Sequence, residues 1–440
     1  MNKSAIHTLE KLRAGQLAGA TRLDLSCDLS TFPPEIFELA DTLEVLNLSG
    51  NALKTLPDDL VKLSKLKVIF CSENQFEHVP EVLGQFEHLS MIGFKSNKIK
   101  TLSAKSLPKN LQWLILTDNQ LTHLPVEIGQ CAGMQKLMLA GNQLSHLPPE
   151  LAACKQLELL RISANQLMLL PNWLLSMPKL AWLAFAGNPF SAENEAYRVK
   201  NAEITRIDWQ RVHIQAQLGQ GASGVIYQAD YLQKNTKTPV AVKLFKGELT
   251  SDGLPQSEMA ACMHAGLHPN LTQILGSIEH HPEKTQGLVL SLIDPSFKIL
   301  ANPPSLTSCT RDVYEKEAQF SLKNLLSIAT GVARAAAHLH ANGLMHGDLY
   351  AHNILHNTAG DCLLSDFGAT AFLPNNNSAL ALQRLEVRAF ACLLEELLAH
   401  CETKNTSECN ALEALQRDCS QATVANRPLF AQIVQTLEAL

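Results

Sequence analysis

A glycine-rich stretch in the second half of the chain is the first candidate for chemistry. It reads Leu218-Gly219-Gln220-Gly221-Ala222-Ser223-Gly224-Val225, and glycines at this spacing occur in loops that cradle phosphate groups. In a dinucleotide-binding fold such a loop leads from a strand into a helix. Here the stretch lies between two strand-like segments, the second being Val225-Ile226-Tyr227, so the context favours a hairpin.

Three further groups of potentially reactive residues follow in order. The first is Val240-Ala241-Val242-Lys243, the second is His346-Gly347-Asp348-Leu349-Tyr350-Ala351-His352-Asn353, and the third is Leu364-Ser365-Asp366-Phe367-Gly368. Together with the glycine-rich stretch, their order resembles the signature set of the protein kinase family. The resemblance covers about residues 207–440 and implies ATP-dependent phosphoryl transfer.

The resemblance implies a role for each matching residue. Lys243 would neutralise the α and β phosphates of ATP, and Glu258 in the following helix would hold it. Asp348 would accept the proton of the substrate hydroxyl, while Asn353 and Asp366 would bind Mg²⁺, which prefers hard oxygen ligands.

The strand Gly287 to Ile293 would lead into the segment that binds adenine through its backbone. The implied catalytic residues are Asp348, Lys243 and Asn353, and the implied metal ligands are Asn353 and Asp366. The implied nucleotide-binding residues are Leu218, Gly219, Gly221, Gly224, Val225, Ala241, Lys243, Glu258, Ser291 and Ile293.

Three positions near Asp348 depart from the kinase pattern. Gly347 replaces the arginine that normally pairs with a phosphorylated activation loop, which predicts that loop phosphorylation is not the switch here. Tyr350 stands where serine/threonine kinases have a lysine, and His352 where many tyrosine kinases have an arginine. Serine or threonine is the favoured acceptor, and tyrosine stays open.

The segment after D-F-G is also unusual. No Ala-Pro-Glu follows, and only about 18 residues separate Gly368 from Glu386. An H-G-D-x-x-x-x-N motif with a short segment also resembles small-molecule kinases of the aminoglycoside and choline type. The complete glycine loop, V-A-V-K and D-F-G favour the protein kinase family instead. A scaffold with an inactive kinase fold is the other alternative, although Lys243, Asp348 and Asp366 are all retained.

Two elements around these motifs matter for their placement. The segment from Glu386 resembles the central buried helix of the kinase large lobe, in which Asp is usual at the position of Glu386. An insertion-like stretch runs from Asn302 to Tyr314, where Arg311 and Tyr314 could shape the substrate cleft. A plain surface loop is the alternative interpretation of this stretch.

The first half of the chain is a repeat array. Asparagines recur at steps of 23, 23, 22, 23, 23 and 23 residues, and apolar residues (or Cys71) stand three and five positions before each. The asparagines are Asn51, Asn74, Asn97, Asn119, Asn142, Asn165 and Asn188. This resembles the leucine-rich repeat family, whose units stack into a curved solenoid because one unit cannot bury its leucines alone. The asparagine side chains are expected to satisfy backbone groups where the chain turns.

The strand positions that should face the concave side are unusually apolar. They include Phe70, Trp113, Met138 and Trp182. Large exposed apolar patches mark interaction sites, and aromatic residues and methionine are favoured there. We expect this face to bind a protein, either a substrate, a regulator or the chain's own second half, although flanking segments could cover it instead.

The composition limits the cellular compartments and the classes of binding partner to be expected. The net charge is −6, which argues against bulk binding to nucleic acid or anionic lipid. Eleven cysteines without a C-x-x-C pair favour reduced thiols. The N-terminus lacks the apolar core of a signal peptide, and the leucine-rich stretch from Met168 to Phe190 is interrupted by prolines and fits the repeat register. These features predict a cytoplasmic protein without a membrane span.

The sequence therefore predicts a two-domain protein that resembles bacterial cytoplasmic kinases in which leucine-rich repeats are joined to a kinase domain without a membrane span. An N-terminal leucine-rich repeat solenoid, an α/β horseshoe of about eight repeats of 22–23 residues, should occupy 1–190. A linker should occupy 191–206, and a bilobal α+β kinase domain 207–440, with its small lobe at about 207–292 and its large lobe at about 293–440.

Overall fold

A computed structural model describes residues 3–201, 205–221, 223–233, 236–247, 249–250 and 252–440. The chain divides into two compact units, Met1–Met177 and Pro178–Leu440. This division precedes the predicted end of the repeats at residue 190. The reason is that strand β8 (Trp182–Ala184) and helix α2 (Pro189–Asn201) group with the second unit. The predicted linker 191–206 is thus largely helical.

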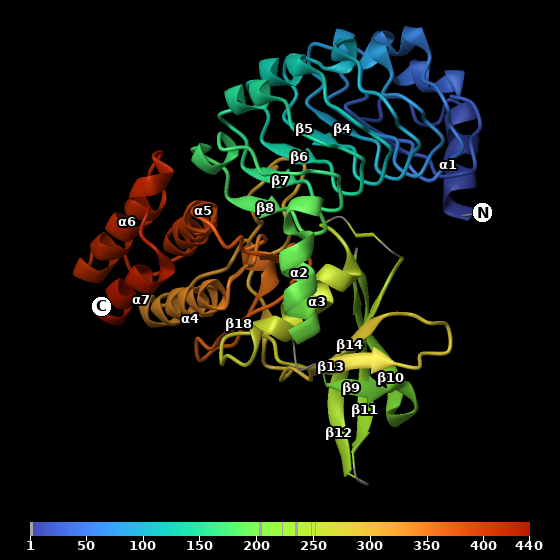
Figure 1. The fold of residues 1–440 in the computed structure, drawn as a ribbon. Helices are drawn as coiled ribbons and strands as arrows, with labels where there is room; N and C mark the ends of the chain where they lie inside the picture. The colour runs from blue at the N-terminus through green and yellow to red at the C-terminus, as the bar shows by residue number, and fades with distance from the viewer. Residues whose placement is uncertain (1–2, 202–204, 222, 234–235, 248, 251) are drawn as a thin grey trace. The chain divides into compact units, whose positions relative to one another are not determined.

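The first unit is a curved stack of parallel strands flanked by short 3₁₀ helices (Figure 1). After helix α1 (Lys3–Arg13), its strands are β1 (Arg22–Asp24), β2 (Val45–Asn47), β3 (Val68–Phe70), β4 (Met91–Gly93), β5 (Trp113–Ile115), β6 (Lys136–Met138) and β7 (Leu159–Arg161). The 3₁₀ helices are η1 (Pro34–Leu39), η2 (Asp58–Lys62), η3 (Glu81–Gln85), η4 (Ala104–Ser106), η5 (Val126–Gln130), η6 (Pro149–Ala153) and η7 (Leu174–Ser176). The predicted solenoid is confirmed, with 3₁₀ turns in place of α-helices on its outer side.

An asparagine ladder holds neighbouring repeats together. Asn119 donates from Nδ2 to the carbonyl oxygens of Phe94, at 2.8 Å, and Leu116, at 3.1 Å. Its Oδ1 accepts the backbone N–H of Ile99 at 2.9 Å. The buried amide therefore satisfies backbone groups of two successive repeats, as the spacing predicts. Leu114 between these repeats is fully buried.

The apolar strand positions line up as predicted, with one exception. Phe70 and Met138 share one column of the sheet, and Trp113 lies in the next column with its ring edge-to-face on Phe70 at 6.2 Å. These three side chains are half-buried. Trp182 differs, because only 1% of its surface is exposed and it packs against Leu349 and Tyr350 of the chain's own second half, one of the expected partners.

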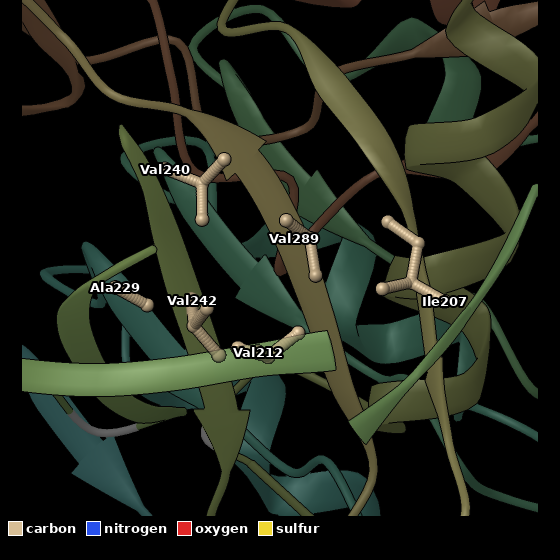
Figure 2. Packing of buried hydrophobic residues seen from close by; sticks show 6 residues of the cluster. All are labelled: Ile207, Val212, Ala229, Val240, Val242 and Val289. Atoms are coloured by element: carbon tan, nitrogen blue, oxygen red, sulfur yellow. The ribbon is translucent and has the colours of Figure 1, made fainter. Parts of the chain in front are cut away.

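The small lobe of the second unit is a six-stranded sheet of order β10-β11-β12-β14-β13-β9. Its strands are β9 (Arg206–Asp208), β10 (Val212–Gln220), β11 (Gly224–Gln233), β12 (Thr236–Phe245), β13 (Ile274–Glu279) and β14 (Gly287–Ser291). Helix α3 (Pro255–Ala265) contacts β13. Figure 2 shows the buried apolar cluster of this lobe, to which Val240 and Val242 contribute from β12 and Val289 from β14. Alternating side chains of β12 thus fix its register, since one face is buried.

The large lobe is mainly helical. Its helices are α4 (Leu322–Ala341), α5 (Ser378–Ala399), α6 (Ser407–Cys419) and α7 (Phe430–Glu438). Its short strands are β15 (Lys298–Ile299), β16 (Leu344–Met345), β17 (Ile354–His356), β18 (Cys362–Leu364) and β19 (Ala371–Phe372), and η9 (Ala351–Asn353) lies between β16 and β17. Helix α5 begins eight residues before Glu386, so the segment after D-F-G is even shorter than the sequence suggests.

Two expectations about the whole chain can be compared with the structure. Each of the eleven cysteines is free, which agrees with the absence of a disulfide framework. Within the described parts of the chain, no helix is both long enough and apolar enough to cross a bilayer.

Candidate active site

A cavity of about 330 Å³ lies within the second unit, between residues of its two lobes. It brings together Gly221 and Gly224 of the glycine-rich hairpin, Lys243, Asn353 and Asp366. The other residues that line it are Ser223, Ile226, Ala241, Glu258, Cys262, Thr272, Ile274, Leu288, Leu290, Ser291, Ile293, His352, Leu355, Ser365 and Phe367. Apolar walls with a few converging polar groups are typical of a small-molecule site.

Lys243 and Glu258 form a buried ion pair. Strand β12 carries Lys243 opposite Ile226 of β11 and Leu288 of β14, and the first turn of α3 carries Glu258. The Nζ of Lys243 lies 2.5 Å from Oε1 of Glu258 and 3.9 Å from Oδ1 of Asp366. Burial opposes the charge of the amine, but the carboxylates of Asp366 and Glu258 outweigh it and raise the pKa of Lys243. The amine therefore stays positive in the cavity.

The glycine-rich stretch forms the predicted hairpin between β10 and β11. The N–H of Gly221 donates to the carbonyl oxygen of Gly224 at 2.9 Å. A Cβ at Gly224 would clash with the carbonyl oxygen of Leu244, so the sheet itself requires glycine there. A Cβ at Gly219 or Gly221 would meet nothing within 4 Å. Protein packing does not explain these two glycines, but close approach to a ligand would.

Asp348 and Asn353 are joined within the catalytic loop, residues 346–353. The Nδ2 of Asn353 donates to the backbone oxygen of Asp348 at 2.9 Å and to its Oδ2 at 2.8 Å. Both hydrogens of the amide are thereby engaged, which leaves Oδ1 as the ligand atom of Asn353. The arrangement suits a residue that orients a carboxylate and also binds a cation.

Asp366 lies at a strained turn after β18. Its φ is 56°, its side chain is 49% exposed, and Oδ1 accepts the N–H of Gly368 at 3.1 Å. The positive φ turns the carboxylate toward the cavity, in which it faces Lys243. The carboxylate of Asp366 and the amide oxygen of Asn353 are hard oxygen donors of the kind that Mg²⁺ takes. The donor set therefore fits a magnesium ion bound together with phosphate oxygens.

Helix α5 fixes the start of the catalytic loop. Glu386 is fully buried, accepts the N–H of Gly347 at 2.6 Å and lies 2.7 Å from Nε2 of His340. Burial alone would raise the pKa of this carboxyl, but the hydrogen bond from His340 and the neighbouring charges hold it below its ordinary value. The glutamate therefore anchors the loop as an anion, as expected for a central buried helix.

The stretch from Asn302 to Tyr314 is not a plain surface loop. Asp312 accepts the backbone N–H of His352 at 2.9 Å, and its other oxygen lies 2.8 Å from Nδ1 of His352. Burial lowers the pKa of His352, but Asp312, Asp348 and Asp366 outweigh burial and raise it. Arg311 pairs with Glu395 and Glu396 on α5. The insertion therefore supports the catalytic loop from outside the cavity.

Some predicted nucleotide-binding residues do not line the cavity. Leu218 is 52% exposed, and neither it nor Gly219 nor Val225 is among the lining residues. Strand alternation explains Val225, because Gly224 and Ile226 share the face that looks into the cavity and Val225 points the other way. The period-two pattern of β11 could have indicated Ile226. Ala241, Ser291 and Ile293 lie on the cavity as expected.

Other residues that line the cavity could not be identified from the sequence around them. Thr272, Ile274, Leu288 and Leu290 come from two neighbouring segments that pair only in the folded sheet. His352 stands out in the sequence as a departure from the kinase pattern, yet only the structure places its ring on the cavity.

Family models match both units. Residues 212–409 match the model described as protein tyrosine and serine/threonine kinase. Residues 109–167 and 42–63 match two models of the leucine-rich repeat. The matched kinase segment contains every residue brought together in the cavity.

The curated relatives share this region at low identity. Fibroblast growth factor receptor 1 of Pleurodeles waltl is 22% identical over 314 residues, which cover 59% of this chain and 38% of the receptor. Ephrin type-A receptor 8 of Mus musculus is 26% identical over 308 residues, or 58% and 29%. A probable inactive serine/threonine-protein kinase of Dictyostelium discoideum, roco10, is 33% identical over 115 residues, or 25% and 4%. The chain thus spans less than two fifths of the length of these relatives.

Proposed function

Because the chain joins leucine-rich repeats to a protein kinase domain, we propose that it is an active ATP-dependent protein kinase. The observation that carries the proposal is the set of charged groups around one cavity. Lys243 is paired with Glu258 and faces Asp366, all three on the cavity, and Asp348, which is not itself a lining residue, is held by Asn353, which is. No member of the phosphoryl-transfer set is missing, which argues against a scaffold with an inactive kinase fold.

The proposed mechanism is positioning and charge neutralisation. Lys243 binds the α and β phosphates of ATP beneath the hairpin of Gly221 and Gly224, and Ala241, Ser291 and Ile293 surround the adenine. Asp348 accepts the proton of the acceptor hydroxyl as its oxygen attacks the γ-phosphorus. The bond between the γ-phosphorus and the bridging oxygen breaks, and the electron pair leaves with ADP. Such catalysis relies on the geometry of the bound groups more than on covalent chemistry with the enzyme.

Asn353 and Asp366 are the proposed ligands of Mg²⁺. When bound, the ion neutralises the charge of the phosphate oxygens. Two features of the chain itself complete the arrangement, because Asn353 Nδ2 holds Asp348 and the turn at Asp366 aims a carboxylate into the cavity.

We assign the acceptor hydroxyl to serine or threonine of a protein bound by the repeats. Phe70, Trp113 and Met138 lie half-buried on strands β3, β5 and β6 of one sheet and supply an aromatic and apolar surface for such a protein. Two of the relatives, one of them named inactive, are named serine/threonine-protein kinases, while the matching family model covers tyrosine and serine/threonine kinases alike. We place the reaction in the cytoplasm, which is the compartment that unpaired thiols favour.

Transfer of labelled γ-phosphate tests the proposal. Purified full-length protein is incubated with γ-labelled ATP, Mg²⁺ and generic protein acceptors, beside Asp366→Ala and the control Asp418→Ala. Asp366 lies on the cavity, whereas Asp418 is exposed on α6. We expect Asp366→Ala to lower transfer by about 10³-fold or more, because loss of a metal anchor raises the barrier by several kcal/mol. Asp418→Ala should match the wild type, and peptide mapping then identifies the acceptor residue.

Two results would reject the protein kinase assignment. ATP binding without transfer to any protein, in wild type and variants alike, would indicate a scaffold. Transfer to an aminoglycoside or an amino alcohol in a metabolite screen, with proteins unlabelled, would indicate a small-molecule kinase.

A further inference from the structure

Strand β8, which carries the strand position of the repeat that ends at Asn188, lies against the catalytic loop. The indole N–H of Trp182 donates to the backbone oxygen of Leu349 at 2.9 Å. The indole ring stacks on the ring of Tyr350, with centroids 4.0 Å apart and planes at 6°. Trp182 is 1% exposed and Tyr350 is 4% exposed, so the stack is buried. The two residues that follow Asp348 are therefore both held by one side chain of β8.

The backbone of β8 also confines the residue that precedes Asp348. Gly347 has a φ of 76°, and a Cβ there would lie 2.5 Å from the carbonyl oxygen of Ala369 and 2.8 Å from that of Leu183. No side chain fits between these two oxygens. Glycine at this position, which the sequence shows only as a departure from the kinase pattern, is thus explained by its positive φ and by the two carbonyl oxygens, one from Ala369 and one from Leu183 of β8.

The other supports of the catalytic loop reach different points. Glu386 holds the N–H of Gly347, Asn353 holds Asp348 itself, and Asp312 holds His352. Trp182 holds Leu349 and Tyr350 from outside the loop, through a hydrogen bond and a stacked ring. Without Trp182, the chain directly after Asp348 would lose a hydrogen bond and a packed ring.

We propose that Trp182 is a positioning residue for Asp348 and that strand β8 thereby supports the phosphoryl-transfer site. This inference rests on the proposed kinase function. Trp182 does not line the cavity. It acts by holding Leu349 and Tyr350, which keeps the carboxylate of Asp348 in the orientation that the transfer needs. Displacement of a reacting group by about 1 Å can cost a factor of about 10² in rate, so a loosened loop should lower kcat. ATP binding depends on Lys243 and the hairpin and should remain.

The test compares Trp182→Ala, Trp182→Phe and the control Trp173→Ala in the full-length protein. Trp173 is the matched tryptophan, because it lies nine residues earlier in the last repeat and is partly exposed. We expect Trp182→Ala to lower kcat by about 10- to 100-fold while KM for ATP changes by less than about threefold. Trp182→Phe keeps a stacking ring and should recover most of the loss. Trp173→Ala should behave as the wild type.

Hydrogen exchange of the peptide that spans residues 344–356 provides a second measurement that does not need activity. Trp182→Ala should accelerate exchange in this peptide and leave strands β11 and β12 protected as in the wild type. If Trp182→Ala does not fold, Trp182→Phe still decides, because loss of the N–H to Leu349 alone should give a smaller change of the same sign.

Two outcomes would overturn the inference. Unchanged kcat with unchanged exchange would show that the loop does not depend on β8. A rise in kcat would show that Trp182 blocks the acceptor site instead of supporting Asp348. A wild-type protein that binds ATP but transfers nothing would reject the kinase proposal, while accelerated exchange in Trp182→Ala would still support the loop contact.

Discussion

Single residues near Asp348 are constrained by packing as much as by chemistry. Gly347 combines a left-handed backbone with two carbonyl oxygens at the position of a Cβ. An arginine, which is usual at this place in protein kinases, cannot be accommodated. The site therefore has no arginine at this position to pair with a phosphorylated residue of the activation loop. This agrees with the short segment that follows Gly368.

We predict that Gly347→Ala destabilises the second unit by about 1–3 kcal/mol, the usual cost of a strained backbone, with the clash in addition. Thermal unfolding measures the change. Gly221→Ala is the control, because its φ is not in the left-handed region and a Cβ there meets nothing within 4 Å. Equal melting temperatures for the two variants would contradict the steric argument.

At the scale of elements, the insertion (Asn302 to Tyr314) is tied to helix α5 by side-chain contacts. The Tyr314 hydroxyl donates to Glu396 at 3.4 Å, and Arg311 lies 3.3 Å from the same carboxyl. Burial raises the pKa of Glu396 to about 8, with Arg311 opposing the shift and Asp312 and Glu395 adding to it. The folded protein is therefore most stable when this carboxyl is neutral.

The sign of the resulting pH dependence follows from proton binding. An unfolded glutamate loses its proton near pH 4.5, while the folded Glu396 keeps it until about pH 8, so stability falls as pH rises through this range. We predict that Glu396→Gln gains stability relative to the wild type between about pH 5 and pH 8, measured as the shift in urea midpoint. Glu395→Gln, at a more exposed carboxyl, should show no such trend. A difference independent of pH would contradict the prediction.

At the scale of the whole molecule, the second unit is longer than the segment that matches the kinase family model. It begins at Pro178 and includes β8 and α2, well before the kinase match at residue 212. Arg427 donates to the carbonyl oxygen of Pro178 at 2.7 Å, and Arg198 of α2 reaches the carbonyl oxygen of Asn342 at 3.3 Å. Residues just after the repeats thus complete the core of the large lobe.

Fragments that begin at different residues test this boundary. We predict that a fragment of residues 178–440 melts higher than one of residues 185–440, which lacks β8 but keeps α2. The shorter fragment loses the burial of Trp182, and removing a buried tryptophan side chain costs about 3–5 kcal/mol. A fragment of residues 207–440 should be less stable still or fail to fold. Equal melting temperatures for the first two would show that β8 is dispensable for the unit.

The sequence by itself determined what depends on spacing and order. The asparagine period identifies the repeats because each amide must reach the backbone of its neighbour, as Asn119 does with Phe94. The resemblance to protein kinases predicts the pairing of Lys243 with Glu258, and the structure brings the two side chains together. Val225 does not line the cavity whereas Ile226 does, because alternate side chains of β11 face opposite sides of the sheet.

Only the tertiary structure decided which surfaces are covered. Trp182 has the same repeat position as Trp113, and nothing local distinguishes the two, yet one is half-buried and the other is stacked on Tyr350. The hydrogen bond from Trp182 to Leu349 joins residues separated by 167 positions in the sequence. Likewise, Asp312 and His352 meet across 40 positions. Side-chain periodicity shows which way a residue points, but burial depends on what packs against it, and that is a property of the folded chain.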